Sequence, residues 1–185
     1  MNLEKIIDEI TKELEAREKR QDFMLQKTRL IVRDCARAIK FLHANDFKQA
    51  KELAKKLDAQ VKELRENDES FENIAFTAYQ EYAEAKALLA LLEKANVPDY
   101  KQLGIPWLPY LSGLADCVGE LRRALQLALR EGKREDAEYY FKKMNELYDE
   151  LMVLKFASSL VGALKRKQDV LRSQVEQARS EMLRH

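Results

Sequence analysis

Residues 3–43 read LEKIIDEITKELEAREKRQDFMLQKTRLIVRDCARAIKFLH and contain neither glycine nor proline. Apolar side chains recur along this stretch at steps of three and four residues, which is the spacing of one face of an α-helix. The clearest members of this face are Met24, Ile31, Cys35, Ala38 and Leu42. The stretch therefore predicts a single helix that is too long for the core of a small monomer to cover.

The remainder of the chain predicts further helices rather than strands. With only five glycines and three prolines, the sequence has little material for the many turns of a β-rich fold. Asp46 and Gln49 have the spacing of a capping box and mark the start of the second helix. We expect helices over residues 46–66, 70–94, 109–132, 134–156 and 159–185. The predicted fold class is all-α, with one domain over residues 1–185 that forms a bundle of six to seven long antiparallel helices.

The charge and the apolar runs of the sequence exclude several classes of protein. Lys and Arg total 33 against 32 for Asp and Glu, a net charge of +1, so any nucleic-acid surface has to be local. The N-terminal segment is too charged for a signal peptide, and no apolar run approaches the ~20 residues that cross a bilayer. We therefore expect a cytoplasmic protein without a membrane partner.

Cysteine and histidine usage narrows the chemistry that the chain can perform. Cys35 and Cys117 lie far apart, with no Cys or His at metal-ligand spacing, which argues against a zinc site and against a disulfide framework. His43 and His185 are the only histidines, so a Ser–His or Cys–His nucleophile is disfavoured. Carboxylates must therefore carry any chemistry.

Two glutamates interrupt the apolar face of the predicted third helix. Glu81 falls three residues after Ala78 and four before Ala85. Glu84 follows one turn later, four residues before Leu88. An unpaired charge on such a face is costly, so we expect something to compensate both carboxylates. A buried salt bridge or a polar contact between helices is the alternative explanation, because buried charges are usually paired.

A second pair of acids lies on the predicted fourth helix, in the segment YLSGLADCVGEL at residues 110–121. Asp116 and Glu120 are four residues apart and share one face, which Gly113 and Gly119 flank. Glycine inside a helix costs about 1 kcal/mol relative to alanine. The two glycines therefore indicate the close approach of another backbone or a ligand, although plain helix packing with solvated acids is an alternative.

Side-by-side packing of these two helices would bring together four carboxylates, those of Glu81, Glu84, Asp116 and Glu120. Such a cluster needs cations, because like charges repel. Mg²⁺ or Mn²⁺ prefers oxygen ligands, and either ion can activate a water molecule and bind a phosphate. The four acids are thus predicted to be metal ligands and catalytic residues for metal-assisted hydrolysis of a phosphodiester.

Several segments resemble the translin and translin-associated factor X family. The most specific is the glycine-flanked run Gly113-Leu-Ala-Asp-Cys-Val-Gly-Glu120, which follows the pair in Glu81-Tyr-Ala-Glu84 and the dipeptide Asp99-Tyr100. The resemblance covers most of the chain and extends to further segments: Arg33 to His43, Gly132, Ala137, Tyr148-Asp-Glu-Leu151 and Lys165-Arg-Lys-Gln-Asp-Val-Leu-Arg172. The short connection before the fourth helix is similar to that of a prokaryotic homologue.

This resemblance implies a seven-helix fold that assembles into a hollow shell, an octamer by analogy, and binds single-stranded RNA or single-stranded DNA. In this family the factor X subunits act as a Mg²⁺-dependent endoribonuclease, whereas translin subunits lack the full set of acids. By resemblance, Glu81 and Glu84 match the catalytic glutamate pair, and Asp116 and Glu120 match the aspartate and the following glutamate. The resemblance thus implies a homo-oligomer of the catalytic type.

A basic line on the first helix is the candidate nucleic-acid surface. It consists of Arg29, Arg33, Arg37 and Lys40, opposite the apolar face, where it is able to follow a phosphate backbone. A solvated helix face is the alternative explanation for this line. Three classes of function remain at this stage: a metal-dependent ribonuclease, a non-catalytic single-strand binder, and a helical scaffold with no nucleic-acid role.

Overall fold

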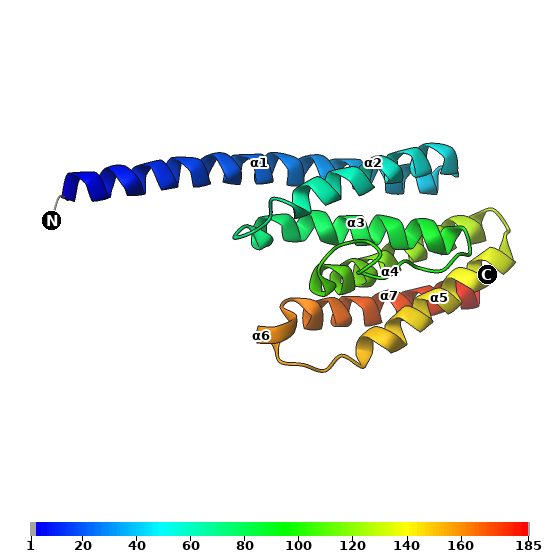
Figure 1. Ribbon diagram of the computed structural model, residues 1–185. Helices are drawn as coiled ribbons and strands as arrows, with labels where there is room; N and C mark the ends of the chain where they lie inside the picture. The colour runs from blue at the N-terminus through cyan, green and yellow to red at the C-terminus, as the bar shows by residue number, and fades with distance from the viewer. Residues whose placement is uncertain (1–2, 185) are drawn as a thin grey trace.

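The computed structural model describes residues 3–184, and within them the chain consists of helices joined by loops (Figure 1). No β-strand occurs in that part of the chain, which confirms the predicted all-α class. The helices are α1 (Leu3–His43), α2 (Phe47–Arg65), α3 (Glu72–Leu92), α4 (Trp107–Arg130), α5 (Arg134–Met152), α6 (Ser158–Val161) and α7 (Leu164–Arg184). None of these helices is both long and apolar enough to cross a membrane.

The helices form two groups that meet at one seam. α1 and α2 pack on one side of α3, while α5 and α7 pack against α4, and α3 lies along α4 between the two groups (Figure 1). α3 is buried on most of its circumference, because alanines, leucines and tyrosines occupy nearly all of its faces. The α3–α4 seam is therefore the centre of the core.

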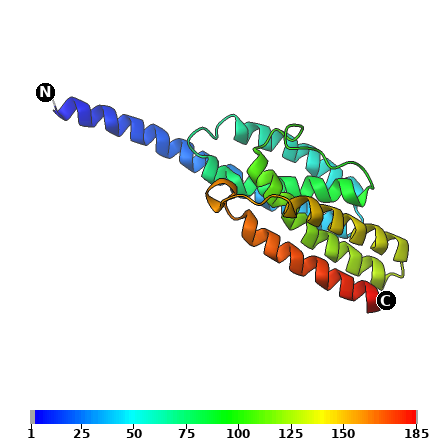
Figure 2. The ribbon, with the colours of Figure 1, turned by 90° about the horizontal axis from the view of Figure 1, so that it is seen from below.

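The first helix begins and ends where the sequence predicted, but only its second half lies in the core. The predicted stripe from Met24 to Leu42 is buried. Residues 3–22, in contrast, are exposed, and this half of α1 projects beyond the bundle (Figures 1 and 2). The Asp46 side chain accepts a hydrogen bond from the Gln49 amide at 3.1 Å, which confirms the predicted cap of α2.

The prediction for the C-terminal region was wrong in two places. α5 ends at Met152 instead of residue 156, and the expected helix over residues 159–185 is divided into α6 and α7. Gly162 has φ 54°, a positive value that other residues rarely adopt, and it ends α6. Leu160, an apolar residue within the expected helix, is 63% exposed, because α6 is one short turn at the edge of the bundle.

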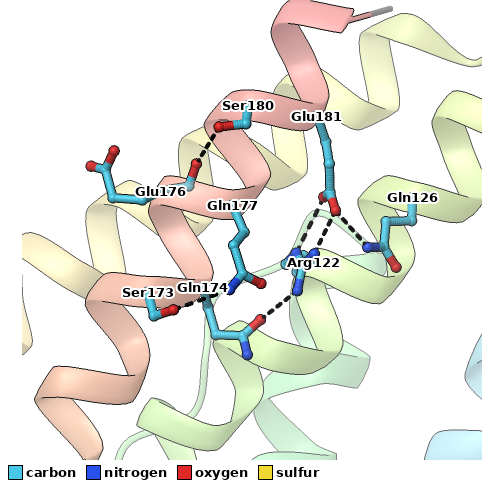
Figure 3. Close-up of polar contacts among 8 residues, drawn as sticks. All are labelled: Arg122, Gln126, Ser173, Gln174, Glu176, Gln177, Ser180 and Glu181. Carbon is cyan, nitrogen blue, oxygen red and sulfur yellow. Dashed lines mark hydrogen bonds and ion pairs between the residues drawn. The ribbon is translucent and has the colours of Figure 1, made fainter.

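α7 is fastened to α4 by a polar network (Figure 3). The Arg122 guanidinium donates from Nε to Glu181 Oε2 at 3.2 Å and from Nη2 to Oε1 at 2.5 Å. Its remaining arm donates to Gln174 Oε1 at 3.2 Å, and Gln126 donates to Glu181 at 2.8 Å. A two-pronged guanidinium–carboxylate contact fixes direction as well as distance. The network therefore sets the position of α7 along α4.

Gly113 allows the backbones of α3 and α4 to meet. A Cβ atom at this position would lie 2.8 Å from Ala83 Cβ and 2.9 Å from the Glu84 amide nitrogen, and closer still to the Gln80 carbonyl oxygen. Gly119 is different, because a Cβ atom there would meet no heavy atom within 4 Å. Of the two glycines that predicted a close approach, Gly113 makes a backbone contact and Gly119 faces open space.

The two glycines supply a matched pair of substitutions. We expect Gly113→Ala to lower the free energy of unfolding by about 1–3 kcal/mol, because an extra methyl group at a tight backbone contact forces the helices apart. We expect Gly119→Ala to raise it by about 0.5–1 kcal/mol, because alanine favours the helix and nothing obstructs its methyl group. Denaturant unfolding followed by circular dichroism measures both, and equal effects of the two changes would contradict the contact at Gly113.

Candidate active site

The four predicted acids lie on both sides of the α3–α4 seam. Glu84 is buried, with 7% of its surface exposed, and its backbone amide is part of the contact at Gly113. Glu81 is half-buried one turn earlier on α3. Asp116 and Glu120 are half-buried on α4, one and two turns after Gly113. We refer to Glu81, Glu84, Asp116 and Glu120 as the acidic cluster.

The pKa values of the two acids on α3 are raised by burial and by the charges of neighbouring acids. The pKa of Glu84 is raised from 4.5 to about 8, first by burial and then by the charges of Glu81, Asp116 and Glu120. Burial also raises the pKa of Glu81, with a contribution from Asp116. The structure therefore brings the four carboxylates into mutual electrostatic range.

Asp116 is held by partners from two other helices. Lys167, on α7, contacts its two carboxylate oxygens at 2.6 and 2.5 Å. Gln80, on α3, donates from Nε2 to Asp116 Oδ2 at 2.8 Å. The Lys167 charge also opposes the rise in the pKa values of Glu81 and Glu84. One lysine thus balances part of the negative charge of three carboxylates.

Glu120 is held by the end of α1. His43 Nε2 lies 2.5 Å from Glu120 Oε2, and the His43 side chain is 5% exposed. This hydrogen bond is the main reason why the pKa of Glu120 is lowered, and Arg123, 3.9 Å away, adds to the effect. A buried histidine at a carboxylate restricts the orientation of that carboxylate.

Glu81 and Glu84 have no comparable partner. Among residues 3–184, neither carboxylate makes a hydrogen bond or an ion pair, and Lys167 is the one cation that acts on their pKa values. The alternative explanation for these two acids, a permanent salt bridge for each, therefore does not apply in this part of the chain. Two buried or half-buried carboxylates are left with lone pairs available to a ligand.

In donor type, the acidic cluster fits a hard divalent cation. Four carboxylates offer only oxygen ligands, as Mg²⁺ and Mn²⁺ prefer. The cluster is not a finished site, because within the described residues no three His, Cys, Asp or Glu side chains converge as metal ligands. Lys167 and His43 engage Asp116 and Glu120, so these two side chains point toward protein partners.

The two cysteines lie beside the acidic cluster without joining it. Both are free and buried, Cys35 on α1 and Cys117 on α4. Burial raises both thiol pKa values, and the charge of Glu84 raises them further. Because the thiolate is the form that attacks substrates and binds metals, these cysteines are inert at neutral pH.

Sequence reasoning missed the three residues that hold the acids. His43 appeared only as one of two histidines, Gln80 was not singled out, and Lys167 appeared only within a segment that resembles the family. The partners come from α1, α3 and α7, and only the tertiary structure places α1 and α7 beside α4. The position of Gln80 next to Glu81 is the one available clue.

The predicted basic line is accessible on α1. Arg29, Arg33, Arg37 and Lys40 are all exposed. Arg37 is partly engaged, because its Nη1 lies 3.4 Å from the buried carboxylate of Asp34, which Lys56 contacts at 2.9 Å. Exposure is compatible both with RNA binding and with the solvated helix face that was the alternative.

The pKa of Glu84 predicts how stability depends on pH. Folding raises this pKa from 4.5 to about 8, so between these values the folded chain binds more protons than the unfolded chain. Stability contributed by this group is complete below pH 4.5 and is lost as the pH rises to about 8, by at most about 1.4 kcal/mol per pH unit. We expect Glu84→Gln to remove this component and to be the more stable protein above pH 8.

Denaturant unfolding with a chelator, repeated from pH 4 to 9, measures this dependence. Glu72→Gln is a suitable control, because Glu72 is an exposed acid on the same helix. Parallel pH curves for the wild type and Glu84→Gln would show that Glu84 keeps an ordinary pKa.

Comparisons with known proteins place this chain in a family. The profile of the Translin family matches residues 2–180. An uncharacterised protein of Methanocaldococcus jannaschii is 32% identical over 164 residues, which are 86% of this chain and 73% of that protein. The relatedness therefore spans the acidic cluster and both groups of helices.

Solved structures share the fold. The crystal structure of apo-NeC3PO superimposes with a TM-score of 0.88 at 22% identity, and the match covers 96% of this chain and 95% of that one. The structure of AfC3PO in complex with duplex RNA gives a TM-score of 0.86 at 31% identity, covering 96% of this chain and 94% of that one. Because the family profile matches residues 2–180, which is nearly the whole of this chain, the chain belongs to the translin family.

Proposed function

We propose that the protein is a metal-dependent endoribonuclease that acts on single-stranded RNA at the acidic cluster. The observation that carries this proposal is the burial of Glu84 among three other carboxylates, with neither Glu81 nor Glu84 paired within the described residues. Burying like charges is unfavourable, and a protein retains such an arrangement where it is used. Hydrolysis of a phosphodiester with the aid of a divalent cation is the chemistry that suits an all-carboxylate site.

Each residue of the site has a distinct role in this proposal. Glu81, Glu84, Asp116 and Glu120 would hold Mg²⁺ or Mn²⁺, which supplies an activated water and stabilises charge on the phosphate when bound. His43 and Gln80 orient Glu120 and Asp116 through their hydrogen bonds. Lys167 limits the repulsion among the carboxylates, so the cluster is able to persist in the fold.

RNA is favoured as the substrate by one relative. AfC3PO, which is 31% identical to this chain, was solved in complex with duplex RNA. The exposed basic line on α1 offers Arg29, Arg33 and Lys40 to a phosphate backbone. Binding assays with single-stranded RNA, duplex RNA and single-stranded DNA in parallel distinguish the preferred strand form.

A specific observation also favours a second function. Two of the four acids already have protein partners, since Lys167 engages Asp116 and His43 engages Glu120. If these pairs are permanent, the cluster is a polar element of the core, and the protein binds RNA without cleaving it. The two functions differ in whether a divalent cation produces any cleavage.

Cleavage of a labelled single-stranded RNA in Mg²⁺ or Mn²⁺, compared with EDTA, tests the nuclease directly. We expect Glu84→Gln and Asp116→Asn to reduce the cleavage rate by at least about 100-fold, because changes to outer-shell residues alone cost about 10–100-fold. RNA binding should survive in both variants, and Glu72→Gln should cleave like the wild type. RNA cleavage that persists in EDTA, or in both site variants, would contradict the metal mechanism.

Metal binding supplies a readout that is independent of activity. In a thermal melt at pH 8, Mn²⁺ should raise the Tm of the wild type, because a bound cation relieves the repulsion around Glu84. The increase should be much smaller in Glu84→Gln. RNA binding without cleavage and without this shift would establish the non-catalytic alternative.

We further propose that the protein works as a homo-oligomer. The projecting half of α1 carries an exposed stripe of large apolar side chains, consisting of Leu3, Ile6, Ile7, Ile10 and Leu14. These positions share one face of the helix, and an uncovered apolar face of this kind marks a protein contact. The family profile begins at residue 2, so this segment is part of the shared domain, which favours a second copy of the chain as the partner.

Substitution within the stripe tests the assembly. We expect Ile7→Glu with Ile10→Glu to yield a smaller particle than the wild type, because buried unpaired carboxylates oppose association. Light scattering coupled to size-exclusion chromatography gives the mass. Lys5→Glu is the control, because it changes the net charge by the same two units, on the opposite face of the same helix. A wild type that is monomeric at micromolar concentration would refute the homo-oligomer.

A further inference from the structure

A cleft of about 400 Å³ opens between α4 and α7 and begins at the acidic cluster. Asp116 is one of its lining residues, so the cleft and the candidate active site share a carboxylate. The cleft is also lined by Gly119, Arg166, Lys167, Val170 and Gln174. We call this the α4–α7 cleft.

The chemistry of the α4–α7 cleft is that of an anion site. Arg166 and Lys167 both line it, and they belong to the first turn of α7, which contains no acid. The N-terminal end of a helix carries a partial positive charge, so cations there are unfavourable for the helix itself. Clustered cations at that position lower the energy of a bound anion instead.

Gly119 keeps the wall of the α4–α7 cleft open. Glycine in a helix interior is unfavourable relative to alanine by about 1 kcal/mol. The tight contact with α3 explains Gly113, but no heavy atom lies within 4 Å of the position of a Gly119 Cβ. Packing among the described residues thus gives no reason for this glycine, whereas a ligand in the cleft would use the space.

The opposite wall is rigid and polar. Gln174 accepts a hydrogen bond from Arg122, which Glu181 holds in turn (Figure 3). The Gln174 amide nitrogen has no partner among the described residues and is available as a donor. From Lys167 to Gln174, α7 advances about 10 Å. The cleft therefore offers these two side chains at separate points along a bound strand.

We propose that the α4–α7 cleft binds the phosphodiester backbone of the RNA strand next to the phosphate cleaved at the acidic cluster. This inference rests on the proposed function, because it assigns the path of the same substrate. Arg166 and Lys167 supply positive charge, Gln174 supplies a neutral donor, and Gly119 supplies room. Lys167 joins the two sites, since the same ammonium group contacts Asp116.

Equilibrium binding of a labelled single-stranded RNA, measured by fluorescence anisotropy in EDTA, tests the charge of the cleft. We expect Arg166→Ala to raise the Kd about 5-fold and to reduce the slope of log K against log salt by about one, as the loss of one phosphate contact does. Lys165→Ala is the matched control. It removes the same charge from the adjacent residue, which is exposed and does not line the cleft.

Filling the α4–α7 cleft tests its shape. Gly119→Leu should weaken RNA binding at least about 5-fold while leaving the Tm unchanged or raised. A Cβ atom at this position meets no heavy atom within 4 Å, and the rest of the leucine side chain has the cleft to occupy. Equal Kd values for the wild type, Arg166→Ala and Gly119→Leu would overturn the proposal. The same is true if Lys165→Ala and Arg166→Ala weaken binding equally, because bulk charge would then explain both.

Protection of an introduced thiol locates the strand without relying on affinity. Both native cysteines are buried, and Val170, 54% exposed, lines the cleft. Saturating RNA should slow maleimide alkylation of the Val170→Cys variant several-fold. It should leave Leu183→Cys unchanged, since Leu183 is exposed at the far end of α7, about 20 Å away. Unprotected alkylation in the Val170→Cys variant would place the strand elsewhere.

The experiments separate this inference from the proposed function. If the wild type cleaves RNA and all cleft variants match it in affinity and protection, only the path of the strand is refuted. If the wild type binds RNA and the cleft variants weaken binding, but no metal produces cleavage, the cleft stands and the nuclease fails. A wild type that binds no RNA refutes both.

Discussion

The contact between the backbones of α3 and α4 at Gly113 is the constraint on which this structure depends. It joins the group of α1, α2 and α3 to the group of α4, α5 and α7, so the apolar faces of both groups are buried by one crossing. The turns that carry the four acids lie beside this crossing. Burial of these apolar faces therefore stabilises a fold in which four like charges lie close together, although their mutual repulsion is unfavourable.

Neighbouring side chains neutralise only part of this repulsion. Lys167 and His43 reach the cluster from α7 and α1, and each engages one acid of α4. Glu81 and Glu84 on α3 receive no partner in the described chain. The pKa of Glu84 rises to about 8, first because of burial and then because of the charges of the other acids. Strain of this kind is common where activity opposes stability. Glu84 is buried at the α3–α4 seam, while Glu81, Asp116 and Glu120 are half-buried, so the cluster lies between the core and the solvent.

Local charge, and not net charge, organises the surfaces of this protein. The formal charge is only +1, yet exposed cations follow α1 and others gather in the first turn of α7 beside the acidic cluster. Salt screens exposed charges that lie more than about 10 Å apart, the Debye length at 0.1 M salt. The charges near a bound ligand therefore matter more than the net charge of the chain. A nearly neutral chain is thus able to carry local groups of exposed cations, one of which lies beside the acidic cluster.

The sequence by itself determined the helical class, the bounds of α1 and the cap of α2, because helical periodicity and capping are local properties. It also singled out the four acids as candidates. It did not determine the break at Gly162 or the exposure of Gly119, because only neighbours in space distinguish a glycine at a turn or a contact from one at a cleft. Tertiary structure alone decided that His43, Gln80 and Lys167 hold two of the acids. A pKa likewise depends on burial and on charges distant in sequence, so the state of Glu84 was fixed only when the helices packed.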